Sequence, residues 1–375
     1  MKDKKPVRVL HVLGALDRGG AETVVMNLYR NINREKIQFD FIIHTDRICD
    51  YTNEVTSLGG KIYTIPKFTG LNILRYRKEW KKFFENHPEY KIMHAHIRST
   101  AILFLGIARK NNIKTISHSH NTSEGSGINA LVKRILEYGI RYKAEYFLAC
   151  SKQAGNWLFG RRVCQKDNFS IMKNGICIKE FRYDKKIREI KRKEFGLNDE
   201  ILIGHIGRFH PQKNHDFIIE IYKEVYRRNS KSMLMLIGEG ELKKEIEEKV
   251  ERLGLKDNVI FTGVREDIPQ LLQAMDLFLF PSLYEGLGIV AVEAQAAGLP
   301  CIVSDVLPEE VFVTDLIKGI GLDEEPNKWV DNIFYNLENH KKDNRLEQNK
   351  SVEKSGYDIE HISDWIEEFY YELLS

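Results

Sequence analysis

The chain has 375 residues, of which 42% are hydrophobic and 30% charged. This composition excludes disordered and fibrous proteins, and the length predicts two domains that each bury a core. The net charge of +3 is divided unevenly: residues 1–175 carry +15 and the remaining residues −12, which indicates an anionic partner for the first half or a solvated basic surface. No apolar run approaches the ~20 residues that span a bilayer. Five scattered cysteines without a CxxC pair favour reduced thiols in the cytoplasm.

The first half of the chain alternates short apolar runs with longer segments of helical spacing. Strict alternation of this kind predicts βαβ units around a parallel sheet. The expected strands are Val7–Leu13, Phe39–His44, Lys61–Ile65, Ile92–His96, Lys114–His118, Tyr146–Cys150 and Asn168–Met172. The helices expected between them include Ala21–Asn31, Leu71–Asn86, Thr100–Lys110 and Ile128–Lys143.

The pattern restarts after a charged, turn-rich stretch, residues 173–198, which we interpret as a hinge. The second series of strands is Ile201–Gly207, Met233–Ile237, Val259–Phe261, Leu277–Phe280 and Cys301–Ser304. Apolar residues at helical spacing over 359–374 predict an amphipathic closing helix. The sequence therefore predicts an α/β protein with two doubly wound, Rossmann-like domains, 1–175 and 176–358, facing each other across a cleft. Helix 359–375 is expected to cross back to the first domain.

Ligands of doubly wound sheets bind beyond the carboxyl ends of the strands, so the turn after the first strand is of interest. It contains Gly19 and Gly20 directly before a helix. Adjacent glycines let the backbone approach a ligand, and the helix offers free N–H groups to an anion. Neither GxGxxG nor a Walker A pattern is present, so the turn predicts an anion contact or simply a tight turn.

Two cations follow the first strand of the second domain. Arg208 comes just after Gly207, and Lys213 lies where the next helix begins. Two fixed cations beside a helix N-terminus suit a diphosphate, although two exposed surface cations are the alternative.

A carboxylate interrupts an apolar helix further along the second domain. Glu293 lies between Val292 and Ala294, and a buried carboxylate is unfavourable unless it accepts hydrogen bonds. The two hydroxyls of a sugar diol can donate them, as can the backbone or an arginine. Glu285, eight residues earlier in a glycine-rich loop, is expected to face the same cleft.

These motifs together resemble glycosyltransferase family 4 over nearly the whole chain. The resemblance rests on Glu285-x7-Glu293, on Gly207-Arg208 with Lys213-Asn214, on Gly19-Gly20 and on the closing helix; residues 294–300 and Ser304-Asp305 resemble bacterial enzymes of capsular polysaccharide and exopolysaccharide synthesis. It implies a GT-B fold and a retaining transfer of a sugar from a nucleotide diphosphate, UDP above all. The implied acceptor is a glycan or a polyprenyl-diphosphate-linked sugar. No protein nucleophile, metal or cofactor is implied.

The resemblance also implies roles for individual residues. Arg208 and Lys213 would hold the donor diphosphate, Glu293 the ribose, and Glu285 the hydroxyls of the transferred sugar. His120 would hydrogen-bond the transferred sugar. The remaining donor-binding positions implied are Gly19, Gly20, Gly207, Gly238, Val264, Gly286, Leu287 and Gly288.

Two HxH pairs stand at strand ends, His94 with His96 and His118 with His120, and alternation places both rings of each pair on one face. His96, His118 and Asn121 are assigned to the acceptor side, with a buried core histidine as the alternative for His96. Four imidazoles also suit zinc, but no acidic residue follows at a spacing typical of metallohydrolases, so we expect no metal.

Cations alternate with aromatic residues over 75–84 and 131–143. Such helices lie on anionic membranes or pack their aromatic face on a sheet. We therefore expect a cytoplasmic protein attached peripherally to the inner face of the cell membrane. Nucleic acid is not expected as a partner, because no recognition motif accompanies the charge. Two other functions stay open: a nucleotide-sugar epimerase or hydrolase of similar fold, and a non-catalytic sugar-nucleotide-binding subunit of a polysaccharide assembly complex.

Overall fold

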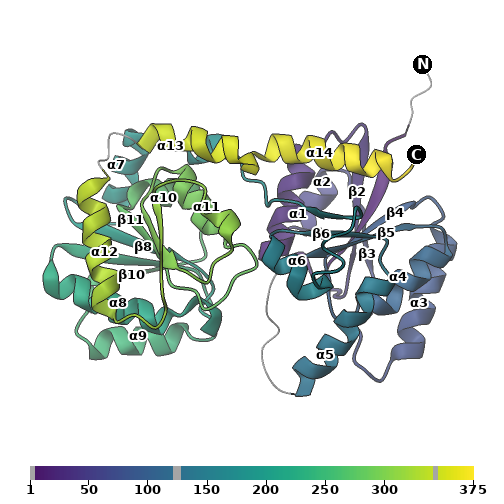
Figure 1. Ribbon diagram of the computed structural model, residues 1–375, viewed down its shortest axis with the longest axis horizontal. Coiled ribbons are helices and arrows are strands. Elements are labelled where there is room, and N and C mark those ends of the chain that lie inside the picture. The colour runs from purple at the N-terminus through teal and green to yellow at the C-terminus, as the bar shows by residue number, and fades with distance from the viewer. Residues whose placement is uncertain (1–4, 121–127, 341–344) are drawn as a thin grey trace. The chain divides into compact units, whose positions relative to one another are not determined.

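The computed structural model describes residues 5–120, 128–340 and 345–375, and it divides into two compact units (Figure 1). Unit 1 comprises residues 1–176 and 358–375, and unit 2 comprises residues 177–357. Unit 1 is therefore discontinuous in sequence: the chain leaves it, builds unit 2 and returns.

Unit 1 contains a parallel sheet of seven strands in the order β3-β2-β1-β4-β5-β6-β7. Its strands are β1 (Val7–Val12), β2 (Ile37–Ile43), β3 (Ile62–Thr64), β4 (Ile92–Ala95), β5 (Lys114–Ser119), β6 (Tyr146–Ala149) and β7 (Phe169–Ile171). Its helices are α1 (Gly20–Asn31), α2 (Thr52–Ser57), α3 (Ile73–Asn86), α4 (Ala101–Lys110), α5 (Ile128–Tyr138), α6 (Lys152–Phe159) and α14 (Ile359–Glu372).

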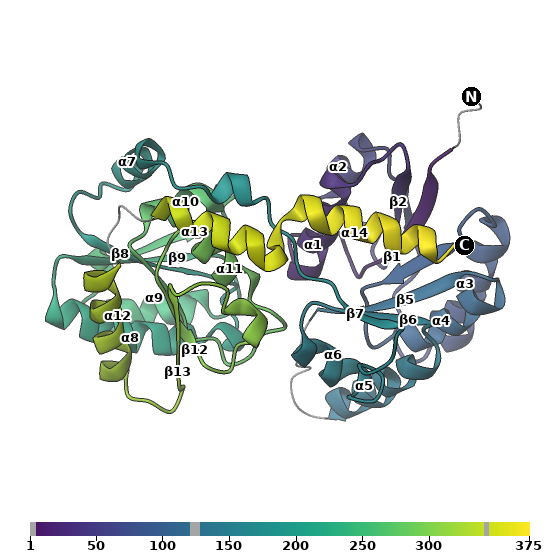
Figure 2. The same ribbon diagram turned by 45° about the horizontal axis from the view of Figure 1, so that its top comes forward.

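Helices cover both faces of this sheet (Figure 2). One face packs on α3, α4 and α6, where Trp80, Phe104 and Phe159 are fully buried. The other face packs on α1 and α14: Phe39 of β2 contacts Tyr29 of α1 and Tyr370 of α14. Because both faces are covered, the inner strands β2 and β4 consist entirely of buried residues, as is usual for parallel sheets.

Unit 2 contains a parallel sheet of six strands in the order β10-β9-β8-β11-β12-β13. Its strands are β8 (Ile201–Ile206), β9 (Ser232–Ile237), β10 (Val259–Gly263), β11 (Leu277–Phe280), β12 (Cys301–Ser304) and β13 (Ile317–Ile320). Its helices are α7 (Lys185–Glu194), α8 (His215–Arg228), α9 (Lys243–Arg252), α10 (Ile268–Ala274), α11 (Ile289–Ala296), α12 (Pro326–Asn339) and α13 (Arg345–Val352).

The expected hinge at residues 173–198 is wrong for most of its length, because it contains α7, which packs on α10 within unit 2. α7 is held by buried arginines, not by an apolar stripe. Arg188 donates to the carbonyl oxygens of Gln273, Ala274 and Met275 and pairs with Asp276 at 2.6 Å. These carbonyls end α10 and lack partners within that helix, so Arg188 caps it.

Two further expectations are corrected or resolved by the structure. β13 was not predicted, because its sequence Ile-Lys-Gly-Ile includes an exposed lysine and a glycine. In α3 the aromatic residues Tyr76, Trp80 and Phe84 are core residues, so these three rings pack inside the unit and do not face solvent. Within the described ranges, no helix combines the length and apolar character needed to cross a membrane.

Candidate functional site

The strand order of unit 2 reverses between β8 and β11, which are hydrogen-bonded neighbours. At such a switch point the loops after the two strands diverge and leave space for a ligand. The loop after β8 contains Gly207, Arg208 and Lys213, and the loop after β11 contains Glu285–Gly288. The residues assigned to the donor from the sequence thus follow the two central strands of this sheet.

Lys213 and Glu285 form the centre of this site. The Nζ atom of Lys213 lies 2.6 Å from Oε1 of Glu285, and both side chains are largely buried. Gln212 donates through Nε2 to the second carboxylate oxygen of Glu285 at 3.1 Å and to the Tyr284 carbonyl at 2.9 Å. The Lys213 ammonium also lies 4.6 Å from the centre of the Phe280 ring. A fixed cation and a fixed carboxylate are therefore adjacent at the switch point.

Arg208 does not share this centre. Its side chain is 71% exposed and pairs with Glu241 at 3.3 Å. The predicted convergence of Arg208 and Lys213 on one point is therefore not present in the structure, where each cation pairs with a different carboxylate. Because Arg208 is exposed, its ion pair stabilises the fold by little and leaves the guanidinium available to another anion.

Glycines bring the loops after β8 and β9 into backbone contact. Gly238 has a φ of +142°, and a Cβ placed there would lie 2.2 Å from the Gly207 carbonyl oxygen. A Cβ on Gly240 would lie 2.4 Å from the Phe209 carbonyl oxygen. The Gly238 N–H also donates to the carbonyl of Gly263 at 3.0 Å. Gly263 is the last residue of β10, so the end of β10 is joined to the loops after β8 and β9. These positions admit only glycine because backbone, which cannot move aside, occupies the space.

Glu293 lies on α11, and burial raises its pKa to about 7 although part of the residue keeps some exposed surface. Within the described part of the chain its carboxylate has no hydrogen-bond or ion-pair partner. The alternative of a carboxylate capped by the backbone or an arginine is therefore not what the described residues show. Of the other donor positions implied by the resemblance, Gly286, Leu287 and Gly288 are buried ahead of α11, with Gly288 at φ +86°, and Val264 is 62% exposed.

In unit 1 the Gly19-Gly20 turn precedes α1, with Gly19 as its N-cap. A Cβ on Gly19 would lie 2.4 Å from a carboxylate oxygen of Glu22, which belongs to the first turn of α1. Burial raises the pKa of Glu22. The Glu22 carboxylate therefore lies beside the backbone that the sequence assigns to an anion. A phosphate could bind there only if the Glu22 side chain moved away or were protonated.

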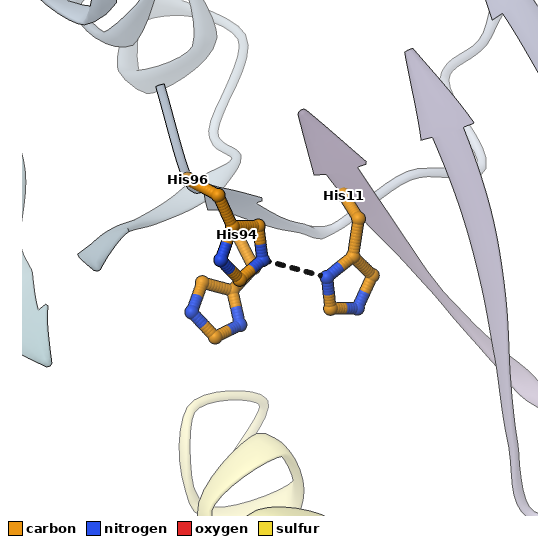
Figure 3. A group of neighbouring side chains, drawn as sticks. All are labelled: His11, His94 and His96. Carbon is orange, nitrogen blue, oxygen red and sulfur yellow. Dashed lines mark hydrogen bonds between the residues drawn. The ribbon is translucent and has the colours of Figure 1, made fainter. Parts of the chain in front are cut away.

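Five histidines meet on the face of the first sheet that α1 and α14 cover. The two HxH pairs come from the adjacent strands β4 and β5, and His11 of β1 joins them, paired in register with His94. His11 Nδ1 lies 3.0 Å from His96 Nε2, and His96 Nδ1 lies 2.8 Å from His120 Nε2 (Figure 3 shows the first of these bonds). His94 Nε2 lies 3.2 Å from His118 Nδ1, and His94 Nδ1 lies 2.7 Å from the Tyr370 hydroxyl.

Burial is the main reason that these imidazoles are neutral. It lowers the pKa of His11 and of His120 to about 3, and that of His94, His96 and His118 well below the ordinary value. Groups of three are close enough to share a metal ion: His11, His94 and His96, or His96, His118 and His120. Each of these rings, however, already has an imidazole partner. Asn121 lies outside the described residues.

Several residues of these sites were not found from the sequence. Gln212 and Glu241 contact the assigned residues Glu285 and Arg208, but neither belongs to a motif that stands out in the chain. His11 and Tyr370 are separated from their partners by 85 and 276 residues. The even spacing of the HxH pairs was the only available signal, and it gives the face of a strand but not the neighbour across it.

Each of the two units matches a family of known proteins. Residues 18–180 match the family described as Glycosyltransferase Family 4, and residues 187–352 match Glycosyl transferases group 1. A protein of Bacillus subtilis (strain 168), putative glycosyltransferase EpsF, is 36% identical over 332 residues, which cover 87% of this chain and 86% of that protein. The Escherichia coli protein UDP-Gal:alpha-D-GlcNAc-diphosphoundecaprenol alpha-1,3-galactosyltransferase is 28% identical over 244 residues, 62% of each chain.

Solved structures share the fold. HepE from Anabaena, in complex with UDP-glucose, has a TM-score of 0.79 at 18% identity, covering 97% of this chain and 99% of that one. WaaG, a glycosyltransferase involved in lipopolysaccharide biosynthesis, has a TM-score of 0.75 at 17% identity, covering 96% and 99%. The two family matches and the identity to EpsF show that this chain belongs to glycosyltransferase family 4 and is a glycosyltransferase with the GT-B fold.

Proposed function

We propose that the protein transfers a sugar from a UDP-sugar to a glycan or polyprenyl-diphosphate-linked acceptor in the synthesis of a surface polysaccharide. The observation that carries this proposal is the largely buried Lys213–Glu285 pair at the switch point of the second sheet. The complex of HepE with UDP-glucose supports the donor class, and the name of the E. coli relative supports the acceptor class.

In this function the Lys213 ammonium leaves its ion pair with Glu285 and binds the donor diphosphate instead. The ammonium stabilises the charge that develops on the departing UDP, and Arg208 exchanges Glu241 for a phosphate oxygen. Glu285, released from Lys213, accepts hydrogen bonds from hydroxyls of the transferred sugar. Glu293 accepts hydrogen bonds from the ribose hydroxyls, which favour its ionised form.

Retention of configuration and independence of metal belong to the proposal. The bond between the anomeric carbon and UDP breaks as the acceptor oxygen bonds to that carbon from the same face. The proton of the acceptor hydroxyl passes to a phosphate oxygen of the departing UDP, so no side-chain nucleophile takes part. Lys213 and Arg208 supply the positive charge that a divalent cation supplies in other transferases. Transfer should therefore persist in EDTA, and an α-linked product from an α-linked donor would support retention.

The acceptor end of the proposal includes a peripheral contact with an anionic membrane. Ile135, Tyr138 and Tyr142 are 65%, 53% and 65% exposed, and the Arg141 guanidinium lies 4.3 Å from the centre of the Tyr138 ring. Beside them is a cavity of about 380 Å3, whose lining includes Arg134, Arg141, Tyr138 and Trp157. Exposed apolar residues among cations are typical of surfaces that bind anionic lipid. Sedimentation with phosphatidylglycerol vesicles, but not with phosphatidylcholine vesicles, would support this contact.

The proposal is tested by binding and transfer with the full chain. Calorimetry with UDP, GDP, ADP and dTDP, each with and without Mg2+, should show selective, magnesium-independent binding of UDP. At 100-fold its Kd, UDP should stabilise the folded protein by about 2.7 kcal/mol. UDP-sugars are then assayed with lipid-diphosphate-linked acceptors. Binding of none of the four nucleotides would contradict the proposal.

The two other functions give different results in the same assays. Release of free sugar or its epimer without an acceptor would identify a hydrolase or an epimerase. Binding of UDP without turnover of any donor, with or without acceptor, would favour a non-catalytic subunit. Neither has a specific observation in its favour.

A further inference from the structure

The cavity of about 380 Å3 beside Tyr138 lies between α5 and α6, which are neighbours in unit 1 (Figure 2). Its lining includes Trp157 and Leu158 of α6 on one side. Arg134 and Tyr138 of α5, with Arg141 in the turn that follows, line the other side. Residues three and four positions apart share one face of a helix, so Arg134 and Arg141 reach the same cavity.

Arg141 is held in a fixed position at this cavity. Its Nη2 atom donates to the Leu158 carbonyl at 3.2 Å, and its guanidinium lies 4.3 Å from the centre of the Tyr138 ring. Gly160, the C-cap of α6, has a φ of +77°, and a Cβ there would lie 3.0 Å from Nη1 of Arg141. Nη1 itself is not buried and has no hydrogen-bond partner among the described residues. A positioned arginine therefore has a donor atom available to a ligand in the cavity.

The cavity and its border carry more positive than negative charge. Glu137 lines the cavity and is largely buried; its Oε1 atom lies 3.8 Å from Nε of Arg98, so this pair is neutral as a whole. The Arg98 guanidinium also lies 5.1 Å from the centre of the Trp157 ring. Within the described ranges, Arg134 and Arg141 belong to no ion pair. Three arginines and one carboxylate therefore leave a charge of +2.

Arg98 also shows where the cavity lies relative to the strands. It follows β4, and its charge contributes, after burial, to the lowered pKa of His120, which follows β5. Ligands of doubly wound sheets bind beyond the carboxyl ends of the strands. The cavity therefore borders the end of the first sheet at which a ligand is expected.

We propose that this cavity binds the diphosphate of a lipid-linked acceptor, with one phosphate on Arg134 and the other on Arg141. A diphosphate esterified at both ends, by a sugar and by a polyprenol, carries one negative charge on each phosphate. Two guanidinium groups balance these charges and bind phosphate oxygens through charge-assisted hydrogen bonds. Ile135 and Tyr142, both 65% exposed beside the cavity, offer apolar surface to the first part of the prenyl chain.

This inference rests on the proposed function and deepens it. It selects the lipid-linked acceptor over a free glycan, and it gives the acceptor's diphosphate a site in unit 1.

Binding of a soluble probe to the full chain provides the first test. The probe is N-acetylglucosamine joined to farnesol through a diphosphate, which has the two charges and a short prenyl chain. Farnesyl N-acetylglucosaminide is the matched compound without the diphosphate. Calorimetry, with and without saturating UDP, should show that the probe binds at least tenfold more tightly than the matched compound. Equal affinities, or no binding of the probe in either condition, would overturn the inference.

Arginine variants provide the second test. Arg134 is exposed, so Arg134→Gln should fold, and it should weaken binding of the probe roughly tenfold through the loss of a hydrogen bond to a charged group. Arg141→Gln should have an effect of similar size, with thermal unfolding to check its fold. Arg77→Gln is the control, because Arg77 of α3 is an exposed arginine of the same unit outside the cavity lining. Wild-type affinity in Arg134→Gln, or an equal loss in Arg77→Gln, would contradict the proposal.

Tryptophan fluorescence reports where the probe binds. Of the four tryptophans, Trp80 and Trp329 are fully buried in the cores and Trp365 belongs to α14, so Trp157 is the one at the cavity. The probe should change the emission of the wild-type protein, and it should bind Trp157→Phe without that change. The same emission change in Trp157→Phe would mean that the probe binds elsewhere.

A phospholipid headgroup is the other source of phosphate at this surface. Dihexanoyl phosphatidylglycerol carries a single phosphate charge, so it should displace the probe at least tenfold less well than the unlabelled diphosphate compound does. Equal displacement would assign the cavity to a membrane headgroup and overturn its assignment to the acceptor.

The transfer assay separates this inference from the proposed function. With a UDP-sugar as donor, Arg134→Gln should raise KM for the lipid-diphosphate-linked acceptor about tenfold, with kcat and the KM for the donor near their wild-type values. If UDP does not bind the wild-type protein, the proposed donor is wrong, while the probe still decides whether the cavity binds a diphosphate. If transfer occurs and Arg134→Gln keeps the wild-type KM for the acceptor, the proposed function stands and the site assigned to the diphosphate is wrong.

Discussion

Unit 1 and unit 2 each contain a parallel sheet whose strand order reverses at a central pair of strands. The side chains near the ends of the strands nevertheless differ in chemistry between the two units. In unit 2 they are ions, Lys213 with Glu285 and Arg208 with Glu241, on loops joined by glycine backbone. In unit 1 they are neutral imidazoles bonded to one another. Charged donors bind phosphate strongly, whereas neutral groups bind hydroxyls without attracting phosphate. Under the proposed function, this difference suits each unit to a different part of the nucleotide sugar and its acceptor.

The largest effect should come from removing the central cation of unit 2. We expect Lys213→Ala to lower kcat/KM for the donor on the order of 100-fold or more, because the charge on the departing diphosphate loses its fixed partner. Lys249→Ala is the control, since Lys249 of α9 is similarly buried and pairs with Asp216 and Glu220 of α8. Steady-state kinetics of both variants would decide. Equal losses of kcat/KM in the two variants would mean that the Lys213–Glu285 pair, like the Lys249 pairs, stabilises the fold without acting on the donor.

Glu293 should lower stability but favour UDP binding, and both effects should depend on pH. Its folded pKa of about 7 lies above the ordinary 4.5, so the folded protein holds the proton more tightly and stability falls as pH rises from about 4.5 to 7. Glu293→Gln should therefore be more stable than wild type at pH 8, by at most about 3 kcal/mol, and nearly equal at pH 5. The same variant should bind UDP more weakly at pH 8. Thermal unfolding and calorimetry at both pH values test this, and a variant less stable at pH 8 would refute the burial argument.

Substituting glycines of unit 2 can separate the cost of backbone strain at positive φ from the cost of a steric clash with neighbouring backbone. Gly238→Ala and Gly254→Ala both place a side chain at positive φ, but only Gly238 would meet backbone, at 2.2 Å from the Gly207 carbonyl oxygen. We expect Gly254→Ala to cost about 1 kcal/mol and Gly238→Ala about 2–3 kcal/mol, because the carbonyl cannot move aside. Urea unfolding of the two variants gives the difference. Similar losses of stability in the two variants would show that the loop after β8 shifts to accommodate the added Cβ at little cost.

The smallest effect should come from the exposed carboxylate that pairs with Arg208. Glu241→Gln should change stability by less than about 0.5 kcal/mol, since both partners are well exposed. It should also tighten UDP binding by roughly twofold at low salt, because Arg208 no longer exchanges one anion for another, and the gain should vanish at high salt. Calorimetry at two salt concentrations measures it. Weaker binding at low salt would instead indicate that Glu241 orients Arg208 for the phosphate.

The elements of both sheets could largely be predicted from sequence because buried parallel strands are continuous apolar runs. The signal failed where another force replaced apolar burial. α7 looked like a linker because it is almost entirely charged, and its anchors are buried arginines that bind carbonyl oxygens. β13 lies at the edge of its sheet, where an exposed lysine is tolerated.

For the candidate sites, sequence indicated which residues matter better than it indicated their partners. Glu285 and Lys213 were both assigned to the donor, but their mutual ion pair depends on how two loops 72 residues apart approach each other. The HxH spacing predicted one face for each histidine pair. It could not predict that His11 and Tyr370 complete the cluster, because those contacts exist only after the strands and the last helix have assembled.

The return of the chain to unit 1 has a consequence for the order in which the protein is made. During synthesis α14 leaves the ribosome only after all of residues 177–357, a delay on the order of 10–40 s at ordinary rates of translation. Until then the sheet of unit 1 lacks both a covering helix and the Tyr370 hydroxyl that shares a hydrogen bond with His94. The imidazole cluster is therefore completed last, so a chain whose synthesis stops early leaves these buried polar groups open to solvent, and unit 2 is finished before unit 1.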